Sequence, residues 1–178
     1  RKNLEWFQEN GFSRVILCPL GYLPEMERIP KTLLNIDVLW YGSDCERRLE
    51  VLADLDHSGL CIKRLVNIYG RERDGWIARS KVILNWHFYE QPIFEIFRCS
   101  YLFANRKAVV SEGGSVDEEL EDLAHQTCTI AERDEIVEVC QRLCKDDERR
   151  RQVEERGYEA FKKIDFVESV RQALEESV

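Results

Sequence analysis

The chain has 178 residues, of which 44% are apolar and 34% are charged, and its formal net charge at pH 7 is −8. This length is sufficient for one compact domain with a substantial buried core. The acidic balance argues against a protein that binds a nucleic-acid backbone, which needs a net basic face, and no apolar run reaches the roughly 18 residues of a membrane-spanning helix.

Residues 1–35 precede the regular part of the pattern. Leu4 and Phe7, followed by Asn10-Gly11, predict a short helix, and residues 15–17 predict an isolated strand. Proline and glycine residues then interrupt an irregular stretch that ends at Pro30. We interpret residues 1–35 as the remnant of a preceding domain and a connector.

Five apolar runs follow, at residues 36–41, 60–66, 82–86, 108–111 and 127–131. Ser43, with Glu46 three residues later, is typical of a capping box at a helix start. Further helices are predicted over residues 71–80 and after Pro92, where Phe94, Phe97 and Tyr101 share one face. Apolar strands that lead into amphipathic helices indicate parallel pairing with both sheet faces covered, a doubly wound α/β fold.

From residue 135 onward the pattern is helical. Its three apolar stripes consist of Ile136, Cys140 and Leu143, of Val153 and Phe161, and of Phe166, Val170 and Leu174. Between the first two lies the charged stretch 146–151. Its three consecutive arginines are preceded by Glu148 and followed by Glu154 and Glu155. This pattern favours a solvated helix face over an anion site. Residues 36–178 are therefore interpreted as a Rossmann-like domain with C-terminal helices.

Seven cysteines are spread along the chain without a CxxC pair. Reduced, buried thiols in a cytoplasmic protein are the simplest interpretation of such an odd set. A zinc site would need a second close-spaced pair of ligands, so no metal is expected. The chain begins with Arg1 instead of Met, and we expect it to be a piece of a longer protein.

Ligands of open parallel sheets bind beyond the carboxyl ends of the strands, where the strand order reverses. This rule selects the loops that begin at Gly42, Tyr69, His87 and Ser111. Gly42-Ser43 leads into a helix N-terminus, which favours an anion, although such a pair is also typical of an ordinary cap. Neither a P-loop nor a GxGxxG motif is present, which disfavours P-loop kinases and nicotinamide cofactors.

The third loop brings together an imidazole, a phenol and a carboxylate, at His87, Tyr89 and Glu90. His87 has the alternative of a structural, hydrogen-bonded side chain, and Glu90 that of a solvated carboxylate. Arg98, on the following helix, would either bind a diphosphate or form an ion pair with Glu95. The last loop contains two glycines, which let backbone approach a ligand closely.

These segments resemble the C-terminal, donor-binding half of a GT-B glycosyltransferase, in particular the branch described as glycosyltransferase family 1 or spore-coat glycosyltransferase-like. The resemblance spans roughly residues 18–163 and is carried by residues 37–43 with Arg47-Arg48, Tyr69-Gly70, residues 80–87, Ala104-Asn105 and residues 109–112, while residues 19–22 resemble the linker that enters this half.

The resemblance implies an enzyme of glycan biosynthesis that transfers a sugar from a UDP-, dTDP- or GDP-sugar to a glycan or another acceptor. It implies no bound metal and no other cofactor, because positive side chains and helix N–H groups stabilise the departing diphosphate. The residues it assigns to donor binding are Gly42, Ser43, Arg47, Tyr69, Gly70, Tyr89, Arg98, Glu112 and Gly113, and its candidate catalytic residues are His87 and Glu90.

Two departures from the family pattern bear on activity. Retaining members carry two glutamates separated by seven residues, whereas Arg98 stands at that distance from Glu90. The N-terminal acceptor-binding half is nearly absent, so the implied partner is a missing acceptor domain or a fused neighbouring domain, and this piece is expected to be at most partly active alone.

Two other classes of function remain open. A receiver-like interaction module would need acidic residues at the strand ends, where Gly42, His87 and Ser111 stand instead. A regulatory domain would keep the nucleotide pocket without turnover. Saturable binding of a nucleotide sugar without slow donor hydrolysis would favour the regulatory domain.

Overall fold

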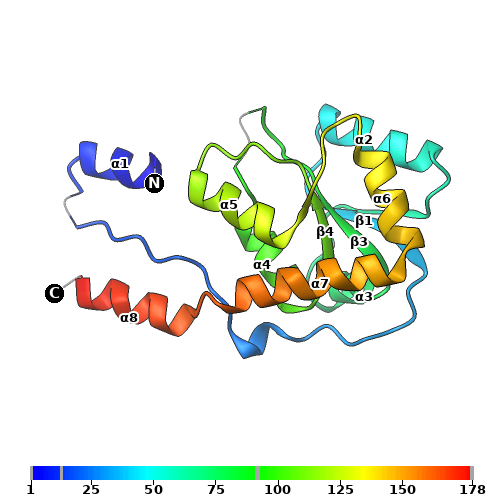
Figure 1. Cartoon of the computed structure of the whole chain (residues 1–178). Helices are drawn as coiled ribbons and strands as arrows, with labels where there is room; N and C mark the ends of the chain where they lie inside the picture. Colours follow the sequence, from blue (N-terminus) through cyan, green and yellow to red (C-terminus); the bar gives the residue numbers. More distant parts are fainter. Residues whose placement is uncertain (1, 13, 91–92, 177–178) are drawn as a thin grey trace.

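The computed structural model describes residues 2–12, 14–90 and 93–176. Within these residues the chain forms a five-stranded, all-parallel sheet in the order β2-β1-β3-β4-β5 (Figure 1). Its strands are Ile36–Tyr41 (β1), Ile62–Leu65 (β2), Ser80–Asn85 (β3), Ala108–Ser111 (β4) and Thr129–Ile130 (β5). The predicted Rossmann-like, doubly wound α/β fold is confirmed.

The central strands are continuous apolar runs because both of their faces are covered. Val38 of β1 pairs with Ile62 on one side and with Val82 on the other, and Ile83 of β3 pairs with Val109. Val38, Val82 and Val109 are completely buried. The last strand is shorter than the predicted run 127–131, because the preceding helix continues through Thr127.

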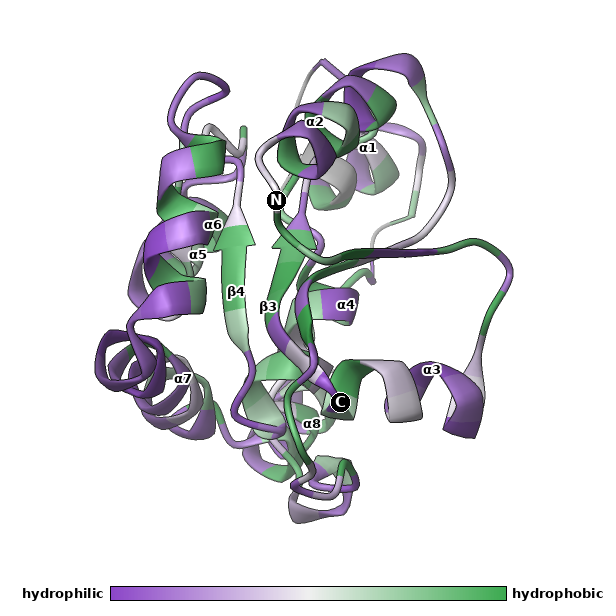
Figure 2. Ribbon diagram, turned by 90° about the vertical axis from the view of Figure 1, so that its right-hand side faces the viewer, coloured by the Kyte–Doolittle hydropathy of each residue, from purple (hydrophilic) through white to green (hydrophobic). Residues whose placement is uncertain are grey.

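Helices cover the two faces of the sheet in two layers. The helices are Lys2–Glu9 (α1), Glu46–His57 (α2), Gly70–Ala78 (α3), Ile96–Ala104 (α4), Glu118–Thr127 (α5), Ile136–Lys145 (α6), Asp147–Lys162 (α7) and Phe166–Glu176 (α8), with a 3-10 turn at Pro24–Met26. One core cluster joins the sheet to α2 and α6, and a second joins it to α3, α4 and α5. In Figure 2, β3 and β4 stand between α6 and α4.

The C-terminal helices differ from one another in burial. The predicted apolar stripes on α6 and α7 are buried, with Ile136, Leu143 and Phe161 at 1% exposure or less. The third predicted stripe lies on α8, where none of the described residues is buried, and Leu174 is 63% exposed. Figure 1 shows α8 extending away from the sheet, so this stripe has no core to cover.

Residues 15–17 are not a strand, contrary to the prediction, because β-branched residues favour extended chain but a strand also needs a partner to pair with. The connector instead contacts the domain further along. Tyr22 forms a parallel bridge with Asp165. The Asn105 side chain accepts from the backbone N–H groups of Arg28 and Ile29 and donates to the carbonyl of Met26.

Two local predictions at helix starts are wrong. Cys45, not Ser43, is the N-cap of α2, and its side chain makes no capping hydrogen bond. The helix begins after Cys45, and the Ser43 carbonyl accepts from the Arg48 guanidinium in the first turn of the helix. Helix α4 begins only at Ile96, which leaves Phe94 buried before the helix and Phe97 82% exposed on it. Pro92 lies outside the described residues.

The arginine run on α7 is only partly a solvated face. Arg149 and Arg151 are exposed, as predicted. Arg150 is 4% exposed, donates to the Leu143 carbonyl and pairs with Asp147 at 2.7 Å. The prediction is wrong for Arg150 because the helical repeat turns consecutive residues in different directions.

Helix α7 approaches the end of α5 closely at Gly157. A Cβ at this position would lie 2.7 Å from the Thr127 carbonyl oxygen. We therefore expect Gly157→Ala to lower the free energy of unfolding by about 1–3 kcal/mol, since overpacking outweighs the better helix propensity of alanine. Urea denaturation measures this change.

Gly75, inside α3, is the matched control, because nothing lies within 4 Å of its missing Cβ. Gly75→Ala should raise stability by roughly 0.5–1 kcal/mol. If both variants were stabilised, the close contact at Gly157 would be refuted.

Candidate functional site

The order of the sheet reverses between β1 and β3, and this point determines where a ligand is expected. The carboxyl end of β1 leads into Gly42, that of β3 leads into Trp86 and His87, and that of the neighbouring β4 leads into Glu112. Three of the four predicted loops therefore meet at one edge of the sheet.

Arg47, in the first turn of α2, forms a two-pronged ion pair with Glu112. Its Nη1 and Nη2 atoms lie 2.9 and 2.6 Å from the two carboxylate oxygens, and Nη1 also donates to the His87 carbonyl at 2.8 Å. The hydrogen bond with Glu112 raises the pKa of Arg47. Because the Arg47 side chain is 31% exposed, the pair faces solvent on one side.

A second ion-pair network lies deeper at the same edge. Arg48 is 3% exposed, and Arg98 is 13% exposed; both bind the single carboxylate of Glu95, at 2.5 and 2.7 Å. Of the two alternatives for Arg98, the structure thus contains the ion pair with Glu95. Two guanidinium groups share one carboxylate, so this network carries an excess positive charge.

Gly42 has no side chain, so the Arg98 guanidinium can lie close to its backbone. Its φ of +148° is unfavourable for other residues, and a Cβ there would lie 2.8 Å from Nη2 of Arg98. Among the described residues, no side chain caps the N-terminus of α2, which follows this turn. The turn therefore leaves helix N–H groups and two arginines at the same edge.

His87 occupies a buried position in this arrangement. It is 2% exposed, its backbone N–H donates to the Glu112 carboxylate at 3.2 Å, and Nε2 lies 3.2 Å from the Glu112 carbonyl oxygen. Burial lowers the pKa of His87, so the imidazole is neutral at pH 7. This environment fits the alternative of a structural histidine that orients Glu112.

Tyr89 and Glu90 extend from the same loop into solvent. Tyr89 is 72% exposed and packs edge-on against Phe88, with ring centroids 4.9 Å apart. Glu90 is exposed and contributes to the raised pKa of Arg47 through its charge. Both side chains are accessible to a ligand bound at this edge.

Tyr69 and Gly70 do not join this group. They follow β2, the edge strand on the far side of β1, and Tyr69 is a 73% exposed N-cap of α3. The Ser111–Gly114 turn is also less open than its glycines indicate. The Glu121 carboxylate accepts from the backbone N–H groups of Gly114 and Ser115, at 2.8 and 2.7 Å.

Gly113 is needed for packing within the same turn. A Cβ at Gly113 would lie 2.9 Å from Cγ2 of Ile130, on β5. The glycine therefore permits close contact between this turn and the neighbouring strand.

A groove of about 630 Å³ opens beside the deeper network. Its walls include His87, Glu95 and Arg98, together with aromatic side chains from residues 88–97. Of these, Tyr89 and Phe97 are exposed. The groove therefore offers flat apolar surfaces next to an excess of positive charge.

Arg48, Asn85 and Glu121 were not identified as candidate site residues from the sequence. Asn85 follows three apolar residues at the end of β3 and donates to Ser111 Oγ at 3.0 Å. This polar position at the end of a buried run is a signal that could have been used. Arg48 stands next to Arg47, but only the fold shows which of the two is buried.

Within the described residues, no group of three or more His, Cys, Asp or Glu side chains is arranged to hold a metal ion. No helix of this part of the chain is long and apolar enough to cross a membrane.

No family model matches the chain. It is similar to two proteins of Acanthamoeba polyphaga mimivirus that are described as uncharacterized, with 33% identity over 103 residues and 29% identity over 114 residues. These matches cover 57% and 63% of this chain but 12% and 36% of the viral proteins. The chain therefore spans about an eighth and about a third of the length of these relatives.

The lowered pKa of His87 predicts a pH-dependent stability. The unfolded chain binds the imidazole proton more tightly than the folded one, so the stabilisation is complete above the unfolded pKa and is lost as the pH falls toward the folded pKa. We expect the free energy of unfolding to decrease between about pH 7 and pH 5, and to decrease less in His87→Gln. Urea denaturation at each pH is the measurement.

The exposed His57 supplies the control, and His57→Gln should follow the pH profile of the wild type. Identical pH profiles for His87→Gln and wild type would contradict the prediction.

The shared carboxylate predicts a large cost for Glu95→Gln. This change leaves buried Arg48 without a counter-charge, and we expect it to lower the free energy of unfolding by about 3 kcal/mol. Glu168→Gln removes a carboxylate from an exposed pair with Arg171 and should cost less than about 1 kcal/mol. If chemical denaturation showed the same loss of free energy of unfolding for both variants, the prediction that Arg48 depends on the Glu95 counter-charge would be wrong.

Proposed function

We propose that the chain is the donor-binding part of a GT-B-type glycosyltransferase, which binds the diphosphate of a nucleotide sugar at the β1/β3 edge. The sugar is transferred to a glycan or another acceptor. The observation that carries the proposal is that the guanidinium groups of buried Arg48 and of partly buried Arg98 share the one carboxylate of Glu95.

An excess positive charge in a largely buried position favours an anion nearby. A diphosphate would neutralise the Arg48–Glu95–Arg98 network more completely than Glu95 alone. The uncapped N-terminus of α2 adds favourable N–H groups at the same place. Arg47, which is partly exposed, can exchange an oxygen of Glu112 for an oxygen of the ligand.

The groove of residues 88–97 offers a binding place for the less charged parts of the donor, the base and the sugar. Exposed aromatic rings such as Tyr89 and Phe97 present surfaces on which a base or a sugar ring packs. Tyr69 lies on the other side of β1, so this groove is better placed than Tyr69 to bind the base.

In the proposed reaction, a hydroxyl oxygen of the acceptor forms a bond to the anomeric carbon of the sugar and releases its proton to the solvent. The bond between the anomeric carbon and the diphosphate oxygen breaks, and the diphosphate retains the electron pair. Arg47, Arg98 and the N–H groups of α2 stabilise the negative charge that develops on this leaving group. Neutral His87 acts as a positioning residue for Glu112, and exposed Glu90 is available to contact sugar hydroxyls.

A second candidate function is a regulatory module that binds a nucleotide without turnover. The observation that favours it is the occupation of two expected ligand contacts by side chains of the chain itself. Glu112 binds Arg47, and Glu121 binds the amides of Gly114 and Ser115. Both candidates share the nucleotide site and differ only in chemistry.

Binding is tested by thermal unfolding with UDP, dTDP and GDP. A ligand at one hundred times its Kd stabilises the native state by about 2.7 kcal/mol, which corresponds to a Tm increase on the order of 5 °C for a domain of this size. Arg47→Gln should lose most of this increase. Arg151→Gln, which removes the same charge from the exposed face of α7, should retain it. A flat response to all three nucleotides would refute the site.

The two candidate functions are then separated with the matching UDP-, dTDP- or GDP-glucose. Slow release of free glucose, lost in Arg47→Gln, supports the transferase. Saturable binding without any release favours the regulatory module over the transferase.

A further inference from the structure

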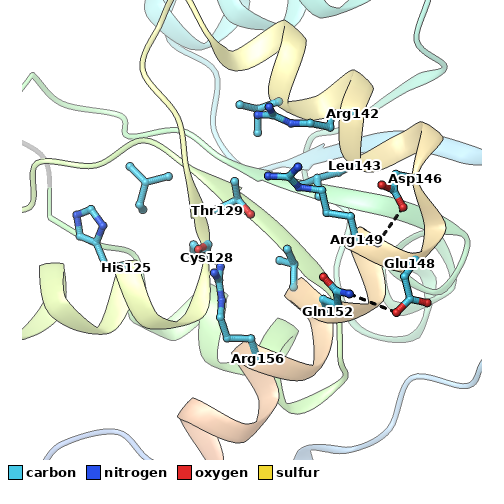
Figure 3. A pocket seen from close by; sticks show the side chains of 13 residues that line it. His125, Cys128, Thr129, Arg142, Leu143, Asp146, Glu148, Arg149, Gln152 and Arg156 are labelled. Carbon is cyan, nitrogen blue, oxygen red and sulfur yellow. Dashed lines mark hydrogen bonds between the residues drawn. The ribbon is translucent and has the colours of Figure 1, made fainter.

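A second and larger groove, of about 780 Å³, lies beside the edge strand β5 (Figure 3). It is bounded by the end of α5, by α6 and by α7, and it shares no lining residue with the groove of residues 88–97. Apolar side chains contribute to its lining, namely Ile130, Val139, Leu143 and Val153. This groove has no part in the function proposed above.

Three arginines line this groove from two helices. Arg142 comes from α6, and Arg149 and Arg156 are seven residues apart on α7, which places them on one helix face. Figure 3 shows the guanidinium groups of Arg142 and Arg149 directed toward the same space above Thr129, while Arg156 reaches toward Cys128. Like charges in such an arrangement repel one another unless an anion lies between them.

The acidic residues of the groove offset this charge only in part, because its lining contains three arginines and two carboxylates, those of Asp146 and Glu148. Asp146 accepts from the backbone N–H of Arg149 as the cap of α7, and Glu148 accepts from Gln152 at 3.3 Å. Arg142 has an exposed and loose pair with Glu138, at 3.7 Å. The groove is therefore locally basic in a chain whose net charge is −8.

We propose that this groove binds a small organic phosphate, with the phosphate group between Arg142 and Arg149 and the organic part on the apolar lining. Guanidinium groups bind phosphate oxygens through pairs of N–H donors, and several of them together match a group with three oxygens better than a carboxylate. The volume of the groove exceeds what a bare phosphate needs. Its apolar walls would contact the organic part of the ligand, which fills the remaining space.

Phenyl phosphate is a suitable probe, because it combines one phosphate with one apolar ring. Inorganic phosphate tests whether the ring contributes, and benzoate tests whether a carboxylate on the same ring is sufficient. The titrations use Arg47→Gln as the background, so that the β1/β3 edge contributes little. Calorimetry gives the affinity, and NMR shifts of the Thr129 and Arg149 amides give the location.

We expect phenyl phosphate to bind more tightly than both inorganic phosphate and benzoate, and to shift both amides. The double change Arg142→Gln and Arg149→Gln should weaken binding at least about tenfold, since it removes charged hydrogen bonds. Both side chains are exposed, so this variant should fold, and its urea denaturation verifies that it does.

Arg151→Gln is the matched control, because Arg151 lies on α7 but does not line this groove. It should bind phenyl phosphate like the background protein. The proposal is overturned if phenyl phosphate does not bind, if benzoate binds equally well, if the double variant keeps the affinity, or if Arg151→Gln weakens binding to the same extent.

Discussion

The Arg48 guanidinium joins the loop after β1 to the segment between β3 and α4. It donates to the Ser43 carbonyl after β1, to the Trp86 carbonyl after β3 and to the Glu95 carboxylate before α4. It also packs 5.6 Å from the centroid of the Trp40 ring. Because a buried charge is costly unless its hydrogen bonds are satisfied, the loops at this edge are constrained to the geometry that satisfies it.

This constraint connects the fold to the candidate site. The parallel sheet brings the ends of β1, β3 and β4 together, and the arginine then fixes the loops that leave them. Burial lowers the pKa of Arg48, and the nearby Glu95 carboxylate opposes that shift, so the group stays charged. The positive charge next to the aromatic groove is thus set by the framework and exists before any ligand arrives, which reduces the cost of binding.

The architecture could be predicted from the sequence, because strands buried on both faces read as continuous apolar runs. The runs 36–41 and 108–111 coincide with β1 and β4. The candidate loops followed from the same pattern, since strand ends determine where they lie. The contacts within them did not: Arg47 and Glu112 are 65 positions apart.

Local signals failed where side chains a few positions away bind backbone groups of the loops. Ser43 carries a capping pattern, yet its carbonyl is bound by Arg48 and α2 begins beyond it. Glu121 reads as an ordinary helical carboxylate, yet it holds the backbone of the preceding turn. These contacts depend on how each loop folds against the helix that follows it, which the capping and helical patterns do not record.

Ile130 connects the arginine groove to the turn that follows β4. It lines the arginine groove, and its Cγ2 atom lies within 2.9 Å of where a Gly113 side chain would begin. An occupant of the arginine groove would therefore contact a side chain that packs against this turn, whose Glu112 binds Arg47. Any effect of that occupant on the turn by this route is steric, so raising the ionic strength would screen the anion itself but leave that mechanical link intact.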